Sequence, residues 1–321
     1  METFKIGICE PSDFSKKAVD MLEKVGEVHL FTGGELSDFI ADKNAIFVRL
    51  GYSIDEDLLK NAAYLKYICS PTTGLNHIKV SKDLYSIVSL KGEYEFLDSI
   101  RATPEHVFGL TIALLRNYAH AFLNSSNPIF DRNPYKGYEI FDNEIGIIGF
   151  GRVGKIIANY YNTFGAHVYY YDSVEKESDI ATKCNSIDEV IKNSNIVVLA
   201  TNYTPENEKM ISEKQFEMLK GKFFINAARG ELVDEDKLIE YIQKDWFKGI
   251  AIDVIANETD TSEFYEKLLN CVSKTNLIIT PHIGGATFSS MERTEEFIAK
   301  KLIDMLKNDK AVRCHYVNNK Q

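Results

Sequence analysis

The sequence predicts an α/β protein of two domains, each built around a parallel sheet. Short apolar runs of strand length alternate with helical patterns along most of the chain. Such alternation indicates right-handed βαβ units, which form parallel sheets covered by helices. The chain has 321 residues, of which 45% are hydrophobic, and this is enough for two separate cores. These observations favour a doubly wound α/β architecture.

The first alternating series covers residues 4 to about 90. Its strand candidates are the apolar runs at 4–9, 28–31, 45–48, 67–69 and 87–90. Apolar residues at helical spacing predict a helix from Phe14 to Val25. Thr103 followed by Pro104 is typical of a helix N-terminus, so we expect a long helix from there to about Asn124.

A second alternating series follows a loop-like segment at residues 125–143. Its strand candidates lie at 145–149, 167–171, 196–200, 223–226, 250–253 and 277–280. A last helix is expected from about Phe288 to Leu306, because apolar residues recur there at helical spacing.

Composition argues against several kinds of partner and location. The net charge of −10 repels nucleic acid and anionic membrane surfaces, so we expect neither as a partner. No apolar run approaches the roughly 18 residues that suggest a membrane span. The five cysteines include no C-x-x-C pair, and we expect reduced thiols in a cytoplasmic protein.

A glycine-rich loop follows the strand candidate at 145–149. Gly149 permits a tight turn, Gly151 lets the backbone approach a pyrophosphate, and Gly154 lets the next helix pack close to the strand. The N-terminus of that helix offers free N–H groups and a partial positive charge to phosphates. The loop therefore predicts a dinucleotide site, although the motif alone also occurs as a plain glycine turn.

Asp172 supports the dinucleotide interpretation and bears on the choice of cofactor. It ends the strand candidate at 167–171, 23 residues after Gly149. A carboxylate at this position can accept hydrogen bonds from ribose hydroxyls, and it repels a 2′-phosphate. Lys176 is the only nearby cation. We therefore predict a Rossmann-type domain that prefers NAD to NADP.

Three later segments each place a polar side chain soon after a predicted strand. Arg229, Glu258 and His282 follow three successive strand candidates. Ligands bind beyond the carboxyl ends of the strands in open α/β sheets, so we expect these side chains at the edge that carries the glycine loop. Each also has a purely structural interpretation, as a surface cation, a solvated acid or a buried, hydrogen-bonded histidine.

Together with the glycine loop, these segments resemble the NAD-dependent D-2-hydroxyacid dehydrogenase family, which includes phosphoglycerate, glycerate and D-lactate dehydrogenases. The resemblance covers nearly the whole chain. It includes Leu65–Ile68 ahead of Thr72–Leu75, and Tyr203–Asn207 ahead of Met210. It implies hydride transfer between NAD(H) and C2 of a small D-2-hydroxy or 2-keto acid, of the phosphoglycerate or glycerate type.

The resemblance implies a catalytic set of three residues. Arg229 is expected to bind the substrate carboxylate, His282 to exchange a proton with the substrate oxygen, and Glu258 to hydrogen-bond His282. The chemistry needs these residue types. An imidazole titrates near neutrality, a carboxylate stabilises the imidazolium, and a guanidinium fork matches a carboxylate.

The same resemblance implies the residues that contact the cofactor and the substrate. The expected NAD contacts are Gly149, Gly151, Arg152, Val153, Gly154, Asp172, Thr204, Ala227, Ala228, Asp253, Gly285 and Thr73. Asp253 is expected to meet the nicotinamide carboxamide. Thr73 and Gly74 are expected to contact the nicotinamide and the substrate carboxylate. No cluster of residues has metal-ligand spacing, so no metal is expected.

Arg49 is a further candidate for substrate binding. It follows the strand candidate at 45–48, on the side where ligands bind. It can bind a phosphate or second carboxylate at the far end of the substrate, share the reacting carboxylate, or merely brace its loop. His77 and His106 are closer to the expected cleft and hinge than other histidines, but we expect neither to be functional.

The resemblance also implies the domain organisation and assembly. An NAD-binding Rossmann domain is expected at 101–290, and a smaller flavodoxin-like substrate domain at 1–100, completed by 291–321. The family usually forms dimers through the long helix near Thr103 and the loop after it, so a homodimer is expected. An NAD-sensing corepressor that binds partner proteins is the alternative function. Formate oxidation is a third, which a histidine paired with Glu258 fits less well.

Overall fold

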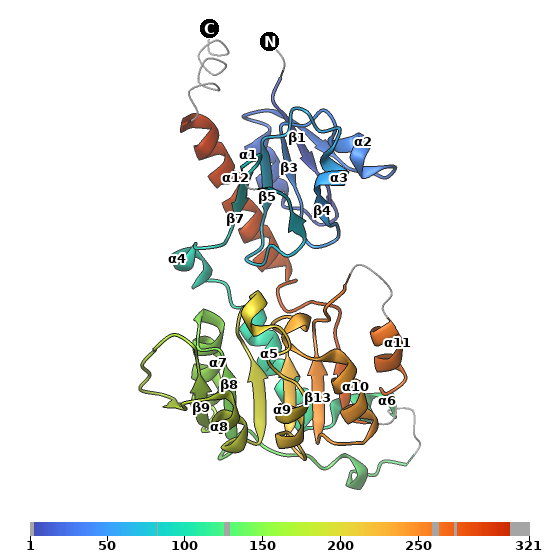
Figure 1. Ribbon diagram of the computed structural model, residues 1–321, viewed down its shortest axis with the longest axis vertical. Helices are drawn as coiled ribbons and strands as arrows, with labels where there is room; N and C mark the ends of the chain where they lie inside the picture. Colours follow the sequence, from blue (N-terminus) through green and yellow to red (C-terminus); the bar gives the residue numbers. More distant parts are fainter. Residues whose placement is uncertain (1–2, 82, 125–128, 259–262, 273–274, 309–321) are drawn as a thin grey trace. The chain divides into compact units, whose positions relative to one another are not determined.

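The chain folds as an α/β protein in two compact units (Figure 1). The computed structural model describes residues 3–81, 83–124, 129–258, 263–272 and 275–308. One unit comprises Met1–Ile100 and Thr287–Gln321, and the other comprises Arg101–Ala286. The second crossing thus lies four residues before the expected position at 290–291. Residues 309–321, which were expected to help complete the first domain, lie outside the described residues.

The first unit contains a parallel sheet of five strands. These strands are β1 (Lys5–Ile8), β2 (Glu27–Leu30), β3 (Ala45–Phe47), β5 (Tyr67–Ser70) and β7 (Ser86–Ser89). Their spatial order is β2-β1-β3-β5-β7, which is the flavodoxin-like order 2-1-3-4-5. The predicted fold of this unit is confirmed. A separate pair, β4 (Ile54–Asp55) and β6 (Ile78–Lys79), was not predicted, because two-residue strands show no alternation of polarity.

Among the residues that the structure describes, five helices accompany the first sheet. They are α1 (Lys16–Leu22), α2 (Leu36–Ile40), α3 (Glu56–Leu59), α4 (Tyr94–Leu97) and α12 (Phe288–Asn308). The helix α1 begins later than predicted, because the Ser15 hydroxyl accepts the Ala18 N–H and caps it there. Buried residues of α12, among them Ile298 and Leu302, join the core of this sheet. The C-terminal helix therefore belongs to the unit formed by the N-terminal residues.

The second unit contains a parallel sheet of seven strands. These are β8 (Glu144–Ile148), β9 (His167–Tyr171), β10 (Thr182–Lys183), β11 (Ile196–Leu199), β12 (Phe223–Asn226), β13 (Gly249–Ile252) and β14 (Leu277–Ile279). Their order is β10-β9-β8-β11-β12-β13-β14, the Rossmann order 3-2-1-4-5-6 with one strand added. Because all strands are parallel, their carboxyl ends lie at one edge of the sheet.

Helices cover both faces of the second sheet, where two apolar cores lie. They are α5 (Ala102–Leu115), α6 (Tyr118–Leu123), α7 (Arg152–Thr163), α8 (Ile187–Lys192), α9 (Glu213–Met218), α10 (Glu235–Gln243) and α11 (Glu263–Leu269). Short 3-10 turns occur at Asn133–Tyr135, Pro205–Asn207 and Gly230–Leu232. No helix in the described part of the chain is long and apolar enough to span a membrane.

The long helix expected from Thr103 to Asn124 was predicted incorrectly in two respects. The helix α5 begins at Ala102 with Arg101 at the N-cap, so Thr103 does not cap it. The helical stretch also breaks at Asn117, whose φ of +53° is left-handed. Asparagine tolerates this conformation, and its amide nitrogen donates to the Lys136 carbonyl at 2.9 Å. The contact with Lys136, 19 residues away in sequence, thus stabilises the break in the helix at Asn117.

Candidate active site

The glycine loop after β8 has the geometry that its sequence predicts. Gly149 has a φ of +98°, a conformation that favours glycine. A Cβ atom on Gly154 would collide with the Gly149 carbonyl oxygen, so the start of α7 packs directly on the turn. A Cβ atom on Gly151 would meet open space, and no side chain caps α7. The N-terminus of α7 can therefore receive an anion.

Asp172 connects the next strand to this loop. One carboxylate oxygen accepts the Phe150 N–H at 2.7 Å and forms an ion pair with the Lys176 ammonium. The other oxygen accepts the Val174 N–H at 2.9 Å. Burial alone raises the pKa of Asp172, but the hydrogen bonds from Lys176, Val174 and Phe150 outweigh burial and lower it. The residues present thus fit a dinucleotide: an open glycine turn, a helix N-terminus and an ionised carboxylate beside them.

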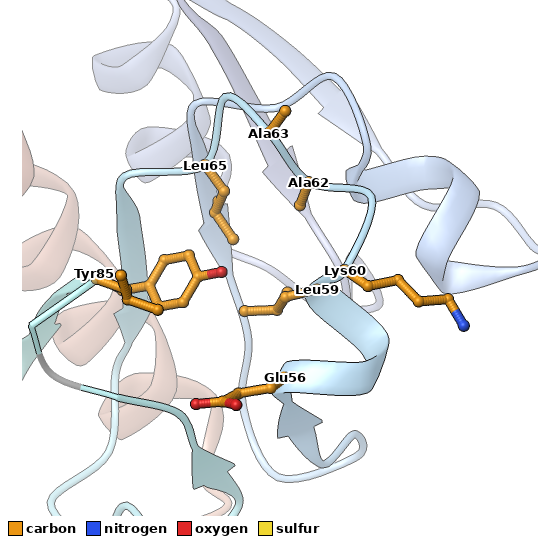
Figure 2. A pocket seen from close by; sticks show the side chains of 8 residues that line it. Glu56, Leu59, Lys60, Ala62, Ala63, Leu65 and Tyr85 are labelled. Carbon is orange, nitrogen blue, oxygen red and sulfur yellow. The ribbon is translucent and has the colours of Figure 1, made fainter.

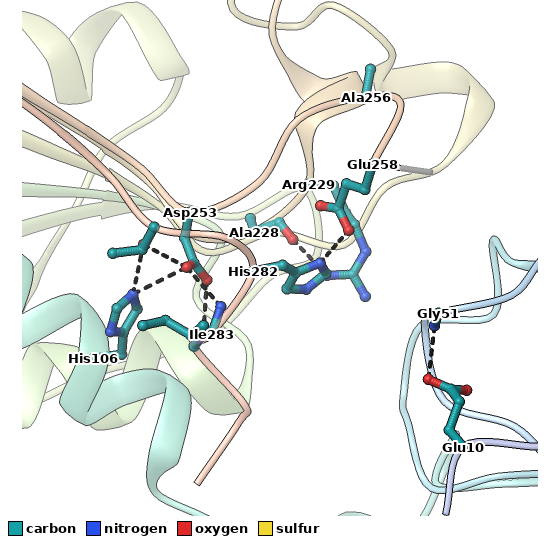
Figure 3. Close-up of polar contacts among 12 residues, drawn as sticks. Glu10, Gly51, His106, Ala228, Arg229, Asp253, Ala256, Glu258, His282 and Ile283 are labelled. Atoms are coloured by element: carbon teal, nitrogen blue, oxygen red, sulfur yellow. Dashed lines mark hydrogen bonds and ion pairs between the residues drawn. The ribbon is translucent and has the colours of Figure 1, made fainter. Parts of the chain in front are cut away.

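Arg229 lies on a loop that is tightly fixed to β12. The amide of the buried Asn226 accepts the Ala228 N–H at 3.0 Å and donates to the Arg229 carbonyl at 2.9 Å. The Arg229 guanidinium donates to the Ala228 carbonyl at 2.6 Å (Figure 3). A Cβ atom on Gly230 would collide with the Ile255–Ala256 peptide. The Arg229 loop therefore lies directly against the loop that leads to Glu258.

His282 and Glu258 form a pair across neighbouring loops. The His282 Nδ1 atom lies 2.6 Å from the Glu258 Oε2 atom, and both side chains are partly exposed (Figure 3). The Glu258 loop is fixed by Glu235, whose carboxylate accepts the Ala256 N–H at 2.7 Å. A carboxylate on Nδ1 leaves Nε2 of the imidazole to exchange a proton with another molecule.

Asp253 ends β13 and is 2% exposed. Its carboxylate accepts the N–H groups of Ile283 and Gly284, both at 2.9 Å, and the Thr280 hydroxyl at 2.6 Å. His106 Nε2 lies 3.2 Å from the same carboxylate. Burial raises the pKa of Asp253, but these hydrogen bonds, with His106 first among them, lower it overall. The nicotinamide contact expected of Asp253 stays a prediction.

The remaining cofactor candidates of this unit follow strands at the same edge. Thr204 begins the turn at Pro205–Asn207 after β11, and its N–H donates to Asn207 at 2.8 Å. Ala227 and Ala228 follow β12. Arg152 and Val153 begin α7, and Gly285 follows β14. All of them belong to Arg101–Ala286 and follow parallel strands whose carboxyl ends share that edge.

The other candidates belong to the first unit. Thr73 is exposed on the loop after β5, and Gly74 is held there by the Thr72 hydroxyl, which donates to the Gly74 carbonyl at 2.8 Å. Thr72 and His77 both lie within hydrogen-bond distance of the Ser70 hydroxyl. The roles of Thr73 and Gly74 stay predictions.

Arg49 is engaged by its own unit. Its guanidinium donates to the carbonyls of Glu10 at 2.8 Å and Ser12 at 2.7 Å, and it lies 3.4 Å from the buried carboxylate of Glu295. The Glu10 carboxylate in turn accepts the N–H groups of Arg49 and Gly51. These contacts favour the bracing role among those that the sequence left open.

A separate hollow of about 370 Å³ lies in the first unit (Figure 2). It is lined by Glu56, Leu59, Lys60, Ala62, Ala63, Leu65, Leu84 and Tyr85. None of the residues predicted for cofactor or substrate binding lines it. In the described ranges, no group of three or more His, Cys, Asp or Glu residues is arranged to hold a metal ion.

Beside the expected catalytic loops, sequence reasoning considered one residue and set it aside, and it missed another. His106 reaches Asp253 from α5, and Glu235 fixes the Glu258 loop from the start of α10. His106 lies in a helical pattern, and Glu235 follows Asp234, a typical N-cap. Neither local pattern indicates a contact with residues that lie far along the chain.

The chain was compared with known proteins. Residues 108–284 match the family model described as D-isomer specific 2-hydroxyacid dehydrogenase, NAD binding domain. A glyoxylate reductase of Pyrococcus furiosus is 29% identical over 305 residues, which cover 90% of this chain and 88% of that protein. A glyoxylate reductase of Thermococcus litoralis is 28% identical over 315 residues, which cover 92% of each. The solved D-lactate dehydrogenase of Aquifex aeolicus, complexed with NAD and lactic acid, superimposes with a TM-score of 0.82 and 24% identity, covering 95% of this chain and 96% of that one.

Proposed function

Because this chain belongs to the family of NAD-dependent D-isomer specific 2-hydroxyacid dehydrogenases, we propose that its substrate is a small D-2-hydroxy acid or the matching 2-keto acid. Within the phosphoglycerate and glycerate types, we favour the unphosphorylated one, glycerate with hydroxypyruvate. The relatives named glyoxylate reductase support a small acid. The observation that carries the proposal is the pair of His282 and Glu258 on the loops beside Arg229.

In this proposal, Arg229 binds the substrate carboxylate. Its loop is held by Asn226, which limits the freedom of the backbone before the substrate arrives. The guanidinium offers a planar set of donors and stays charged at any physiological pH. It can therefore bind the carboxylate with two hydrogen bonds and place C2 at a defined position.

His282 carries the proton in both directions. With Nδ1 bound by Glu258, the Nε2–H of the imidazolium donates to the keto oxygen during reduction, and the neutral ring accepts the hydroxyl proton during oxidation. Glu258 stabilises the imidazolium and holds the ring in one orientation. Since Glu258 is itself held through the Ala256–Glu235 contact, the pair is oriented before substrate binds.

The glycine loop and its neighbours hold the dinucleotide. The backbone at Gly149, Gly151 and Gly154 receives the pyrophosphate, Asp172 the adenosine ribose, and the loop around Thr204 and Ala227–Ala228 lines the remainder. When bound, NAD supplies the hydride acceptor, and NADH the hydride donor, at C2 of the substrate.

The contacts of Arg49 favour a substrate without a phosphate at its far end. A phosphate at the far end of the substrate needs a cation, and the Arg49 guanidinium is already bound to two carbonyls and to the Glu295 carboxylate. Recruiting it would break charge-assisted contacts that hold its own loop. We therefore favour a substrate without a distal phosphate.

The experiment is NADH oxidation with glyoxylate, hydroxypyruvate, pyruvate and phosphohydroxypyruvate. We expect hydroxypyruvate or glyoxylate to give the highest kcat/KM. A clear preference for phosphohydroxypyruvate would overturn the choice of substrate but leave the reaction class intact. NADH binding without turnover of any acid would overturn the reaction class and favour the corepressor alternative.

Asp172 is expected to set the preference for NAD. In Asp172→Ala, the ratio of kcat/KM for NADP to that for NAD should rise by at least about tenfold, because a hydrogen bond to a charged group contributes about 1.5–3 kcal/mol. Loss of the carboxylate also releases the Lys176 ammonium, which can then pair with a 2′-phosphate. Steady-state kinetics with both cofactors measure the ratio.

The matched control for this variant is Glu175→Ala. Glu175 is another carboxylate of the same loop, but it is exposed and paired with Lys183 instead of the glycine turn. Its removal should leave the cofactor ratio unchanged. An equal ratio in Asp172→Ala and the parent protein would place Asp172 away from the ribose.

We also propose that the protein forms a homodimer through α6 and the segment after it. This region exposes large apolar side chains, namely Phe122, Leu123, Ile129, Phe130, Tyr138 and Phe141. The helix α6 itself contains no buried residue. Apolar surface of this kind is typical of a protein interface, and a second copy of the chain is the partner that the family resemblance implies.

A cytoplasmic location is the matching proposal for the compartment. Cys9, Cys69, Cys184 and Cys271 are free and buried. Free thiols of this kind persist in a reducing compartment.

A further inference from the structure

His282 has a backbone conformation that is uncommon for a residue with a Cβ atom. Its φ is +51°, in the left-handed region, which costs free energy for most residues other than glycine. The direction of the imidazole depends on this conformation, because the Cα–Cβ bond would point elsewhere in an extended or right-handed backbone. Some contact must therefore hold the turn at Pro281–Gly284.

Asp253 supplies that contact from both its side chain and its main chain. The two carboxylate oxygens accept the N–H groups of Ile283 and Gly284, the residues that follow His282. The Asp253 carbonyl accepts the His282 N–H at 2.7 Å. A Cβ atom on Gly284 would lie 2.9 Å from the carboxylate, so the turn is packed directly against it. Asp253 thus encloses the left-handed residue.

Asp253 is in turn held by a histidine from another element. His106, on α5, is largely buried, with 17% of its side chain exposed. Its Nε2 atom lies 3.2 Å from both the Asp253 carboxylate and the Thr280 hydroxyl oxygen. The Thr280 hydroxyl already donates to Asp253, so Nε2 must carry the hydrogen that both oxygens share. Figure 3 shows this ring directed at Asp253 from the side of α5.

We propose that His106 is a positioning residue for His282. It donates to Asp253, which keeps the carboxylate oriented towards Ile283 and Gly284 and thereby keeps His282 left-handed, with its ring directed to Glu258. The proposal rests on the proposed role of His282 as the acid–base group. His106 itself touches neither substrate nor cofactor in this scheme.

The test compares His106→Leu, which removes the donor, with His106→Gln, whose side-chain nitrogen can restore it. In His106→Leu, kcat for the preferred keto acid should fall about tenfold to a hundredfold, because misplacing a reacting group by about 1 Å has an effect of that size. NADH affinity, measured by fluorescence, should fall much less than kcat, because the glycine loop and Asp172 are untouched even if the contact expected between Asp253 and the nicotinamide is weakened. His106→Gln should recover most of kcat. The split between kcat and NADH binding distinguishes positioning from general loss of structure.

The matched control is His120→Leu. His120, on α6, has the same kind of contact, but its Nε2 atom lies 3.1 Å from the Thr275 carbonyl instead of near Asp253. Its removal should leave kcat unchanged. A kcat loss that His120→Leu reproduces would overturn the positioning role, as would a loss that His106→Gln does not recover.

A second readout is independent of turnover. The ring nitrogen signals of His282, assigned by their absence in His282→Ala, should shift or broaden in His106→Leu and stay in place in His120→Leu. If His282→Ala keeps full activity, the acid–base assignment fails. If His282→Ala is inactive while His106→Leu shows parental kcat and unshifted His282 signals, only the positioning role fails.

Discussion

Replacing His282 with alanine should lower kcat by about 10²–10⁴-fold, the usual contribution of a general acid–base group. The reason is the loss of the proton carrier: Glu258 lies 2.6 Å from Nδ1, whereas the proposed mechanism exchanges the proton at Nε2 on the other side of the ring. NADH binding should be nearly intact, since the glycine loop and Asp172 lie on other loops of the sheet. Stopped-flow or steady-state NADH oxidation, paired with fluorescence titration of NADH, measures both quantities.

The control for this prediction is His167→Ala. His167 also lies near a carboxylate, with its Nε2 atom 3.2 Å from Asp142, but it begins β9 and so lies at the amino end of the sheet. Its loss should leave kcat unchanged. Near-parental turnover in His282→Ala would remove His282 from the reaction.

Replacing Arg229 with leucine should lower kcat/KM by about 10²–10⁴-fold, because two hydrogen bonds to a carboxylate contribute about 1.5–3 kcal/mol each. Arg229→Lys keeps the charge but not the planar fork, so its loss should be intermediate. Every 2-keto acid carries the carboxylate at C1. The fold-loss should therefore be similar for glyoxylate, hydroxypyruvate and pyruvate, which kinetics on the three acids can measure.

Lys214→Leu is the control, since Lys214 is an exposed cation of the same unit, paired with Asp188 and outside the proposed dimer interface. Its kcat/KM should equal that of the parent protein. A loss in Arg229→Leu that is confined to one keto acid would mean that Arg229 contacts the variable end of the substrate instead of the carboxylate.

Strands were the elements that sequence reasoning located best. Those at His167–Tyr171 and Phe223–Asn226 have the predicted bounds. Buried parallel strands are continuous apolar runs, and such runs can be recognised in the sequence without knowing the tertiary structure. The helix from Thr103 was harder, because its break at Asn117 depends on a hydrogen bond to Lys136 rather than on a local breaker such as proline.

Local sequence patterns also predicted part of the candidate site. Glycines at positions 149, 151 and 154, with an acid at 172, indicate a dinucleotide site, because the glycines allow close backbone approach and the acid can bind the ribose within a single βαβ unit. Arg229, Glu258 and His282 could be expected at one edge because parallel strands bring their carboxyl ends together, and their roles were implied by the family resemblance. That rule places loops, but it does not give the distance between two side chains.

The sequence by itself determined the fold class, the succession of strands along the chain and the loops at which the candidate site lies, since these follow from periodicity, glycine sterics and chain connectivity. Only the tertiary structure decided which polar side chains are already hydrogen-bonded to other residues of the chain. Arg49 is bound to Glu10 and Ser12, and Asp253 to the turn that carries His282. His106 contacts Thr280 across 174 residues of sequence, and no local pattern records such a pair. Hydrogen-bond partners depend on distances of a few ångströms, which packing sets.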